Sequence, residues 1–149
     1  MGRTRSLKTK MRAAFIALAL LLGAAFSAPA QAQRVALEIV PGVSRSEPQF
    51  AAYLRRALPA EIQKALAGKY KGPLRVRIAD VKIMRHPGFG IADRADYLDG
   101  ILFVPGRDPV PIRLTLPFDR SLFSFTPQGE NIRVRNLVEV FAQWVAKYT

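Results

Sequence analysis

Apolar and polar residues alternate in several stretches of this chain, as they do in β-strands with one buried face. The first stretch spans 35–39 and ends at Pro41-Gly42. Another spans 112–118, where Pro117 indicates an edge strand because proline has no N–H for a sheet ladder. Between them, 97–104 is apolar on both faces, which is typical of a tightly packed strand or one covered twice.

A further predicted strand, 74–83, changes phase within its length. Its apolar residues hold the even positions up to Ile78 and the odd positions from Val81 onward. A shift of one residue would turn the second half of the strand toward solvent. We therefore predict a β-bulge near Ala79 and Asp80, because one extra residue keeps both halves buried on the same face.

The segment after Ser46 has the period of a helix. Ser46 and Gln49 resemble a capping box at its start, and Gly68 marks its end. Because the stripe continues through Pro59, we expect one kinked helix or two short collinear ones. The stripe consists of Phe50, Leu54, Leu58, Ile62 and Leu66.

A second helix closes the chain. Asn136 and Glu139 resemble a capping pair, which predicts that this helix starts at Asn136. Trp144 and Tyr148 belong to its apolar stripe, so we interpret them as core residues rather than as the lining of a pocket. The stripe consists of Leu137, Val138, Phe141, Trp144, Val145 and Tyr148.

This order of elements predicts an α+β fold for residues 33–149. We expect a two-layer domain in which two main helices pack on one face of a mostly antiparallel sheet of four or five strands. The fifth strand would be a short one at Phe123 and Phe125.

The first 32 residues have the pattern of a signal peptide. Five basic residues and no acidic one precede an apolar run from Ala13 to Phe26. Small residues follow, and Ala30-Gln31-Ala32 fits a signal-peptidase site, so we predict cleavage between Ala32 and Gln33, with Ala30 as the second choice. The protein is therefore expected to be exported to the periplasm or secreted.

Two other interpretations of this leader fit its residues less well. An uncleaved membrane anchor would tether the domain, but a spanning helix needs about 20 apolar residues and this run has 14. A lipid-modified leader would need a cysteine at the cleavage point, and the chain has none. The absence of cysteine also excludes disulfides, thiol catalysis and cysteine-based zinc sites.

Basic residues are concentrated in the first half of the domain. The chain has a net charge of +12, and removal of the leader's five basic residues leaves +7. All of this surplus lies between Arg45 and Arg85, where ten basic residues face three acidic ones. We expect a one-sided field that attracts an anionic envelope component or an acidic protein. The candidate binding residues are Arg55, Arg56, Lys69, Lys71, Arg75 and Arg77.

A second candidate site is the group His86, Asp93, Asp96 and Asp99. An imidazole and three carboxylates could bind a divalent cation or perform acid-base catalysis. Their spacing argues against a calcium loop, whose oxygen ligands come from every second position. We interpret these residues as a polar loop and treat the metal-dependent or acid-base enzyme as an alternative.

Other catalytic and binding motifs are missing from the sequence. Ser121 and Ser124 lack a nucleophile-elbow context, and Gly88-Phe89-Gly90 is not a phosphate-binding loop. No basic-aromatic module for nucleic acid is present either. We therefore expect an exported, non-enzymatic binding module that needs no cofactor, and the sequence does not reveal its oligomeric state.

The position of the leader's cleavage site is directly testable. We expect N-terminal sequencing of the exported protein to begin at Gln33. A sequence that begins at Met1 or Gly2 would instead show that the leader is retained as an anchor.

Overall fold

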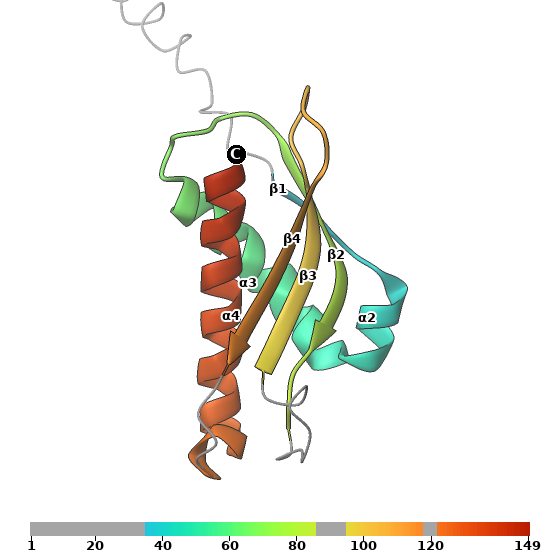
Figure 1. Cartoon of the computed structure of the whole chain (residues 1–149), viewed down its shortest axis with the longest axis vertical. Helices are drawn as coiled ribbons and strands as arrows, with labels where there is room; N and C mark the ends of the chain where they lie inside the picture. The colour runs from blue at the N-terminus through green and yellow to red at the C-terminus, as the bar shows by residue number, and fades with distance from the viewer. Residues whose placement is uncertain (1–34, 86–94, 118–121) are drawn as a thin grey trace, which may run out of the picture. The chain divides into compact units, whose positions relative to one another are not determined.

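The computed structural model shows a four-stranded sheet covered on one face by two long helices (Figure 1). It describes residues 35–85, 95–117 and 122–149. All of them belong to one of the two units of the chain, Gln33–Thr149. The predicted leader and the segment around His86 lie outside the described residues. Within the described ranges, no helix is long and apolar enough to cross a membrane.

The sheet has the order β1-β2-β3-β4. β1 runs parallel to β2, and the remaining neighbours are antiparallel. This arrangement confirms the predicted α+β fold with a mostly antiparallel sheet, and it places β4 at an edge, as Pro117 indicated. The elements are β1 Val35–Ile39, α2 Pro41–Ser46, α3 Pro48–Leu66, β2 Leu74–Lys82, β3 Ala95–Phe103, β4 Val110–Pro117, the 3-10 helix η2 Leu122–Phe125, and α4 Pro127–Tyr148.

The core lies between the sheet and the two long helices. Burial alternates along β2 and β3, so that every second side chain points toward the helices. All five residues of the predicted α3 stripe are buried, and Ala51 joins them. α4 contributes Leu137, Val138, Phe141, Ala142 and Val145 to the same cluster. Removal of this apolar surface from water is the main stabilising contribution to the fold.

The predicted bulge in β2 is confirmed. Ile78 pairs with Gly100, but Asp80 pairs with Asp99, so Ala79 is the extra residue. Because of it, Val81 and Ile83 are buried although they hold odd positions. Both halves of β2 therefore face the helices.

β3 is covered by helices on one face only, so of the two predicted alternatives the doubly covered strand is wrong and the tightly packed strand remains. Both main helices pack on one side of the sheet, so the strand has one buried face and one half-buried face. On the outer face, Tyr97, Ile101 and Phe103 are shielded by side chains of neighbouring strands. The guanidinium of Arg75, for example, lies 4.2 Å from the centre of the Phe103 ring. The apolar character of β3 reflects this lateral packing rather than a second layer.

The predicted capping box at Ser46 is wrong. Ser46 is the last residue of the short helix α2, and its hydroxyl donates to the Val43 carbonyl at 3.4 Å. Glu47 occupies the N-cap position of α3 instead. α3 then runs as a single helix through Pro59 and ends at Leu66, where Ala67 adopts a left-handed backbone conformation with φ 44°.

The predicted start of the closing helix and the short strand before it are also wrong. α4 begins at Pro127, where the Thr126 hydroxyl accepts a hydrogen bond from the Gly129 N–H at 3.2 Å. Phe123 and Phe125 lie in the 3-10 helix η2 rather than in a strand. The apolar stripe did not reveal the first turns of α4 because Arg133 occupies one of their core-facing positions.

Gly100 permits the close approach of α4 to the sheet. A Cβ atom at this position would lie 2.7 Å from Cζ of Phe141 and 3.2 Å from the Arg77 carbonyl oxygen. Phe141 is fully buried, so its ring has no free space into which it could move.

We expect Gly100→Ala to lower the free energy of unfolding by about 1–3 kcal/mol, because overpacking a filled core costs about this much. Urea denaturation followed by circular dichroism measures the change. Gly42→Ala is the matched control, since no atom lies within 4 Å of the added methyl group, and it should leave stability unchanged or slightly raised. Equal stability of Gly100→Ala and the wild type would contradict the close packing.

Candidate functional site

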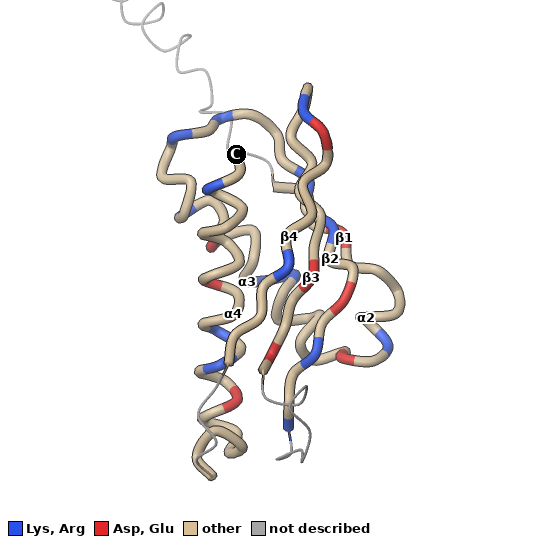
Figure 2. The backbone as a smooth tube through the Cα atoms, viewed as in Figure 1, with Lys and Arg blue, Asp and Glu red and all other residues tan. Residues whose placement is uncertain are grey.

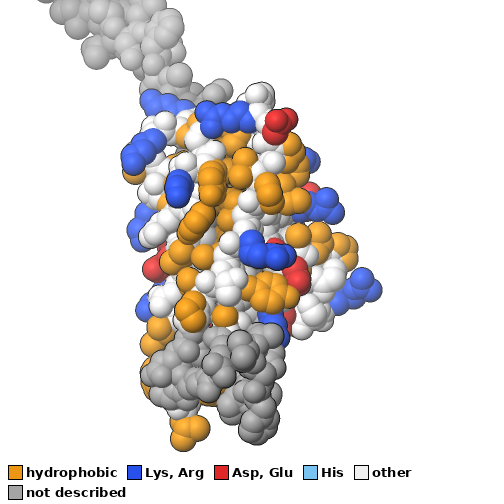
Figure 3. Space-filling view, viewed as in Figure 1, with side chains coloured by type: hydrophobic (Ala, Val, Ile, Leu, Met, Phe, Trp, Pro, Cys, Tyr) orange, Lys and Arg blue, Asp and Glu red, His pale blue; other side chains and the backbone are white. Residues whose placement is uncertain are grey.

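Five basic residues meet at one end of the domain, which we call the basic end. They come from the α3–β2 connection, the start of β2, the β3–β4 turn and the last turn of α4, and these segments lie together in Figures 1 and 2. Several Lys and Arg side chains are also visible at this end in the space-filling view (Figure 3). The five residues are Lys69, Lys71, Arg75, Arg107 and Lys147.

Most cations of the basic end have no acidic partner among the described residues. Lys69 and Lys71 are exposed and form no ion pair with them. Arg107 donates to the backbone oxygen of Thr149 at 2.8 Å. Asp108 is the acidic side chain in these segments, so five basic side chains minus one acidic side chain leave a net side-chain charge of +4.

Aromatic rings accompany the cations of the basic end. Arg75 stacks on Phe103, and the Lys147 ammonium lies 4.8 Å from the centre of the Trp144 ring. Tyr148 lies next to Trp144, with 5.8 Å between the ring centres. Such cation–π contacts contribute about 0.5–1 kcal/mol at exposed sites. They also hold the positive charges next to exposed or half-buried apolar rings.

Only three of the six predicted binding residues, Lys69, Lys71 and Arg75, belong to the basic end. Arg77 lies further along β2 and pairs with Glu38 at 3.2 Å. Arg55 and Arg56 project from α3, on the other side of the core from the outer face of the sheet. Arg55 donates to the Ser44 hydroxyl at 2.9 Å, and Arg56 lies 5.9 Å from the centre of the Tyr53 ring. The six residues therefore do not form one surface.

Sequence reasoning missed Arg107 and Lys147. Both lie in the second half of the domain, where basic and acidic residues are equal in number. The net charge along the sequence therefore does not single them out. Their neighbours Gly106 and Trp144 were interpreted as turn and core residues. The antiparallel pairing of β2 with β3 brings the β3–β4 turn to the same end of the domain as the α3–β2 connection, and α4 ends there as well (Figure 1).

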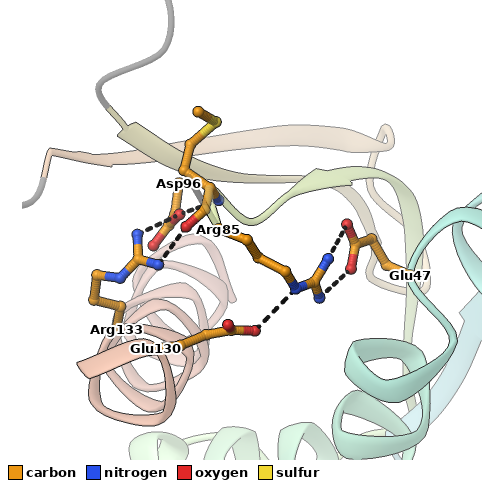
Figure 4. Close-up of polar contacts among 6 residues, drawn as sticks. Glu47, Arg85, Asp96, Glu130 and Arg133 are labelled. Atoms are coloured by element: carbon orange, nitrogen blue, oxygen red, sulfur yellow. Dashed lines mark hydrogen bonds and ion pairs between the residues drawn. The ribbon is translucent and has the colours of Figure 1, made fainter. Parts of the chain in front are cut away.

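At the opposite end of the sheet, Asp96 and Arg133 form a buried ion pair. Asp96, which is 1% exposed, accepts hydrogen bonds from the Arg133 guanidinium at 3.0 Å and from the Met84 N–H at 2.9 Å. Arg133 also donates to the Met84 carbonyl (Figure 4). This network joins the end of β2, the start of β3 and α4, so it fixes the positions of these three elements relative to one another.

Burial raises the pKa of Asp96 above its ordinary value, and the Met84 N–H and Arg133 offset part of this rise. The folded chain therefore binds the Asp96 proton more tightly than the unfolded chain does. It follows that the contribution of Asp96 to stability declines as pH rises from about 4 through the raised pKa.

A second ion pair lies beside the first. Arg85 donates to both carboxylate oxygens of Glu47, at 2.6 and 3.0 Å, and to Glu130 at 3.2 Å (Figure 4). The hydrogen bond to Glu47 is the main cause of the raised pKa of Arg85. These contacts link the starts of α3 and α4 to the end of β2, so the charge of Arg85 serves to connect elements of the fold.

The second candidate site does not assemble among the described residues. Asp96 points into the core, whereas Asp99 lies on the outer face and pairs with Arg113 at 2.7 Å. His86 and Asp93 lie outside the described ranges. In the part of the chain that the structure describes, no three His, Asp or Glu side chains are grouped to hold a metal.

Solved structures of two bacterial lipoproteins are among those to which this chain is similar. No family model and no curated protein matches the chain. A solved structure of a minor lipoprotein from Acinetobacter baumannii is 12% identical to this chain, with a TM-score of 0.46. The aligned region covers 78% of this chain and 91% of the lipoprotein chain. The rare lipoprotein B from Shewanella oneidensis is 10% identical and covers 77% and 89%, with a TM-score of 0.34.

The buried pair makes a pH-dependent prediction. We expect Arg133→Met to lower the free energy of unfolding by about 3–5 kcal/mol at pH 8, because an ionised Asp96 is then left buried without a cation. The loss should shrink as pH falls, since Asp96 can take up a proton. Denaturant unfolding at several pH values measures both effects.

Arg113→Met is the matched control for this experiment. Its partner is also an aspartate of β3, but the Arg113 side chain is 79% exposed. We expect little loss of stability and little pH dependence, because an ion pair to an exposed arginine contributes little. A pH-independent loss in Arg133→Met would show that Asp96 is not the group responsible.

Proposed function

We propose that this protein is an exported, non-enzymatic module that binds an anionic partner of the cell envelope through the basic end. The observation that carries the proposal is the presence of five basic side chains, from four separate segments, at one end of the domain, with a local net side-chain charge of +4. Unpaired cations repel one another, and a stable fold gains nothing from placing them together. An anionic ligand offsets this repulsion.

The contrast between the two ends supports a binding role. At the opposite end, Arg85 and Arg133 are each paired with carboxylates, so their charges are already compensated within the fold. Lys69 and Lys71 have no carboxylate partner among the described residues. Their compact ammonium charges lie at the ends of flexible side chains. Such groups suit a surface that contacts phosphate or carboxylate groups.

The dipoles of the helices account for only part of the basic end. α3 and α4 both end here, and cations near helix C-termini are favourable by about 0.3–1 kcal/mol each. This effect explains a lysine such as Lys147. It does not explain Arg75 or Arg107, which lie on a strand and in a turn.

Export to the periplasm is the location that the leader supports. Its basic segment, apolar run and small-residue site have the order of a cleavable signal peptide. An uncleaved leader would instead hold the same domain at a membrane. Both cases place the basic end where anionic envelope components are abundant.

Charge removal at the basic end tests this function. We compare Lys69→Gln/Lys71→Gln/Lys147→Gln with a control triple that removes three exposed charges elsewhere, Arg45→Gln/Arg113→Gln/Arg135→Gln. Retention of the purified protein on immobilised envelope extract is measured as a function of salt. We expect the basic-end triple to weaken retention by about tenfold or more, since each exposed ionic contact contributes up to about 1 kcal/mol.

The control triple lowers the net charge of the chain by the same amount, so it should retain nearly wild-type binding. Equal weakening by the two triples would mean that net charge alone governs retention. No salt-dependent retention of the wild type would overturn the proposed function.

A further inference from the structure

The aromatic side chains of the basic end specify the kind of anionic partner. Trp144 is half-buried, and Tyr148 is 37% exposed at the last turn of α4. Tyr70 lies between Lys69 and Lys71 in the α3–β2 connection, and its hydroxyl donates to the Pro73 carbonyl at 3.3 Å. A ring with a polar edge next to a lysine is typical of residues at the boundary between lipid headgroups and water.

We propose that the basic end docks on the surface of an anionic phospholipid bilayer, with its lysines at the headgroup phosphates and Trp144 and Tyr148 at the headgroup boundary. This inference rests on the proposed function and names its partner. A soluble acidic protein would need a surface that matches the geometry of this one. A bilayer needs only positive charge and interfacial rings at one end of the domain. Lys69, Lys71 and Lys147 provide the charge, and Trp144 and Tyr148 lie next to Lys147.

The start of the domain supports this orientation. Val35, the first residue of β1, pairs with Leu74 at the start of β2, so the domain begins at the basic end (Figure 1). The predicted leader directly precedes this strand in the sequence, so a leader held in a membrane would join the domain at the end that carries the cations.

The opposite end of the molecule is unlike an anionic-lipid surface. Among its described residues, Arg85 and Arg133 are paired with Glu47, Asp96 and Glu130. It also carries exposed apolar side chains, Leu122 and Phe123, in η2. An anionic surface is therefore expected to select the basic end and to leave Phe123 in water.

The single tryptophan of the chain, Trp144, reports on this docking. The exported protein is mixed with vesicles of phosphatidylcholine alone, or of phosphatidylcholine with about one third phosphatidylglycerol. Co-sedimentation measures binding, and quenching of Trp144 fluorescence by brominated lipid measures its depth. We expect binding and quenching with the anionic vesicles only, and both should decline as salt rises.

Variants locate the contact. Lys69→Gln/Lys71→Gln/Lys147→Gln should weaken partitioning into anionic vesicles by on the order of 100-fold, whereas the control triple Arg45→Gln/Arg113→Gln/Arg135→Gln stays within a few-fold of the wild type. Tyr148→Ser should weaken binding several-fold, and Phe123→Ser, an exposed ring at the opposite end, should not. Thermal unfolding of each variant verifies that the fold is intact.

Three results would overturn the inference: no binding to anionic vesicles, binding without quenching of Trp144, or equal weakening by the two triples. The proposed function is tested separately by retention on envelope extract. The basic end could be needed for that retention although the wild type does not bind vesicles. In that case the partner is an acidic protein or glycan, and only the bilayer inference fails. If both assays are negative, the proposed function fails as well.

Discussion

Coverage of the sheet on one face only is the constraint on which the rest of the structure depends. Because α3 and α4 pack on the same side, each strand has to bury every second residue and leave the others on the outer face. The bulge at Ala79 keeps β2 in phase with this requirement, and Gly100 lets α4 approach closely enough to fill the core. Arg75 and Arg77 reach the outer face for the same reason.

The same constraint explains the buried ion pair. Asp96 holds a core-facing position at the start of β3, where a carboxylate needs partners to offset its desolvation. Arg133 supplies them from a core-facing position of α4, together with the Met84 N–H. The charges of Asp96 and Arg133 are therefore compensated within the fold. At the basic end, Arg75 and Lys147 lie against aromatic rings, and Lys69 and Lys71 form no ion pair with the described residues, which leaves these cations available to a partner.

The sequence predicted features that depend on neighbouring residues. The period of four in α3, the alternation in the strands and the phase change near Ala79 each arise from local geometry, so they survive in the structure. The start of α4 could not be predicted in this way, because Arg133 interrupts its apolar stripe. The burial of Arg133 is explained by its ion pair with Asp96, which lies 37 residues earlier in the sequence. Ser46 was misassigned because a capping pattern does not exclude a short helix before it.

By itself, the sequence determined the fold class, the buried faces of the strands and helices, and the concentration of basic residues between Arg45 and Arg85. Tertiary structure alone decided which of these charges share a surface. It separated Arg55, Arg56 and Arg77 from Lys69 and Lys71, and it brought in Arg107 and Lys147 from distant segments. The physical reason is that charge interactions depend on distance in space, whereas a net charge along the chain records only distance in sequence.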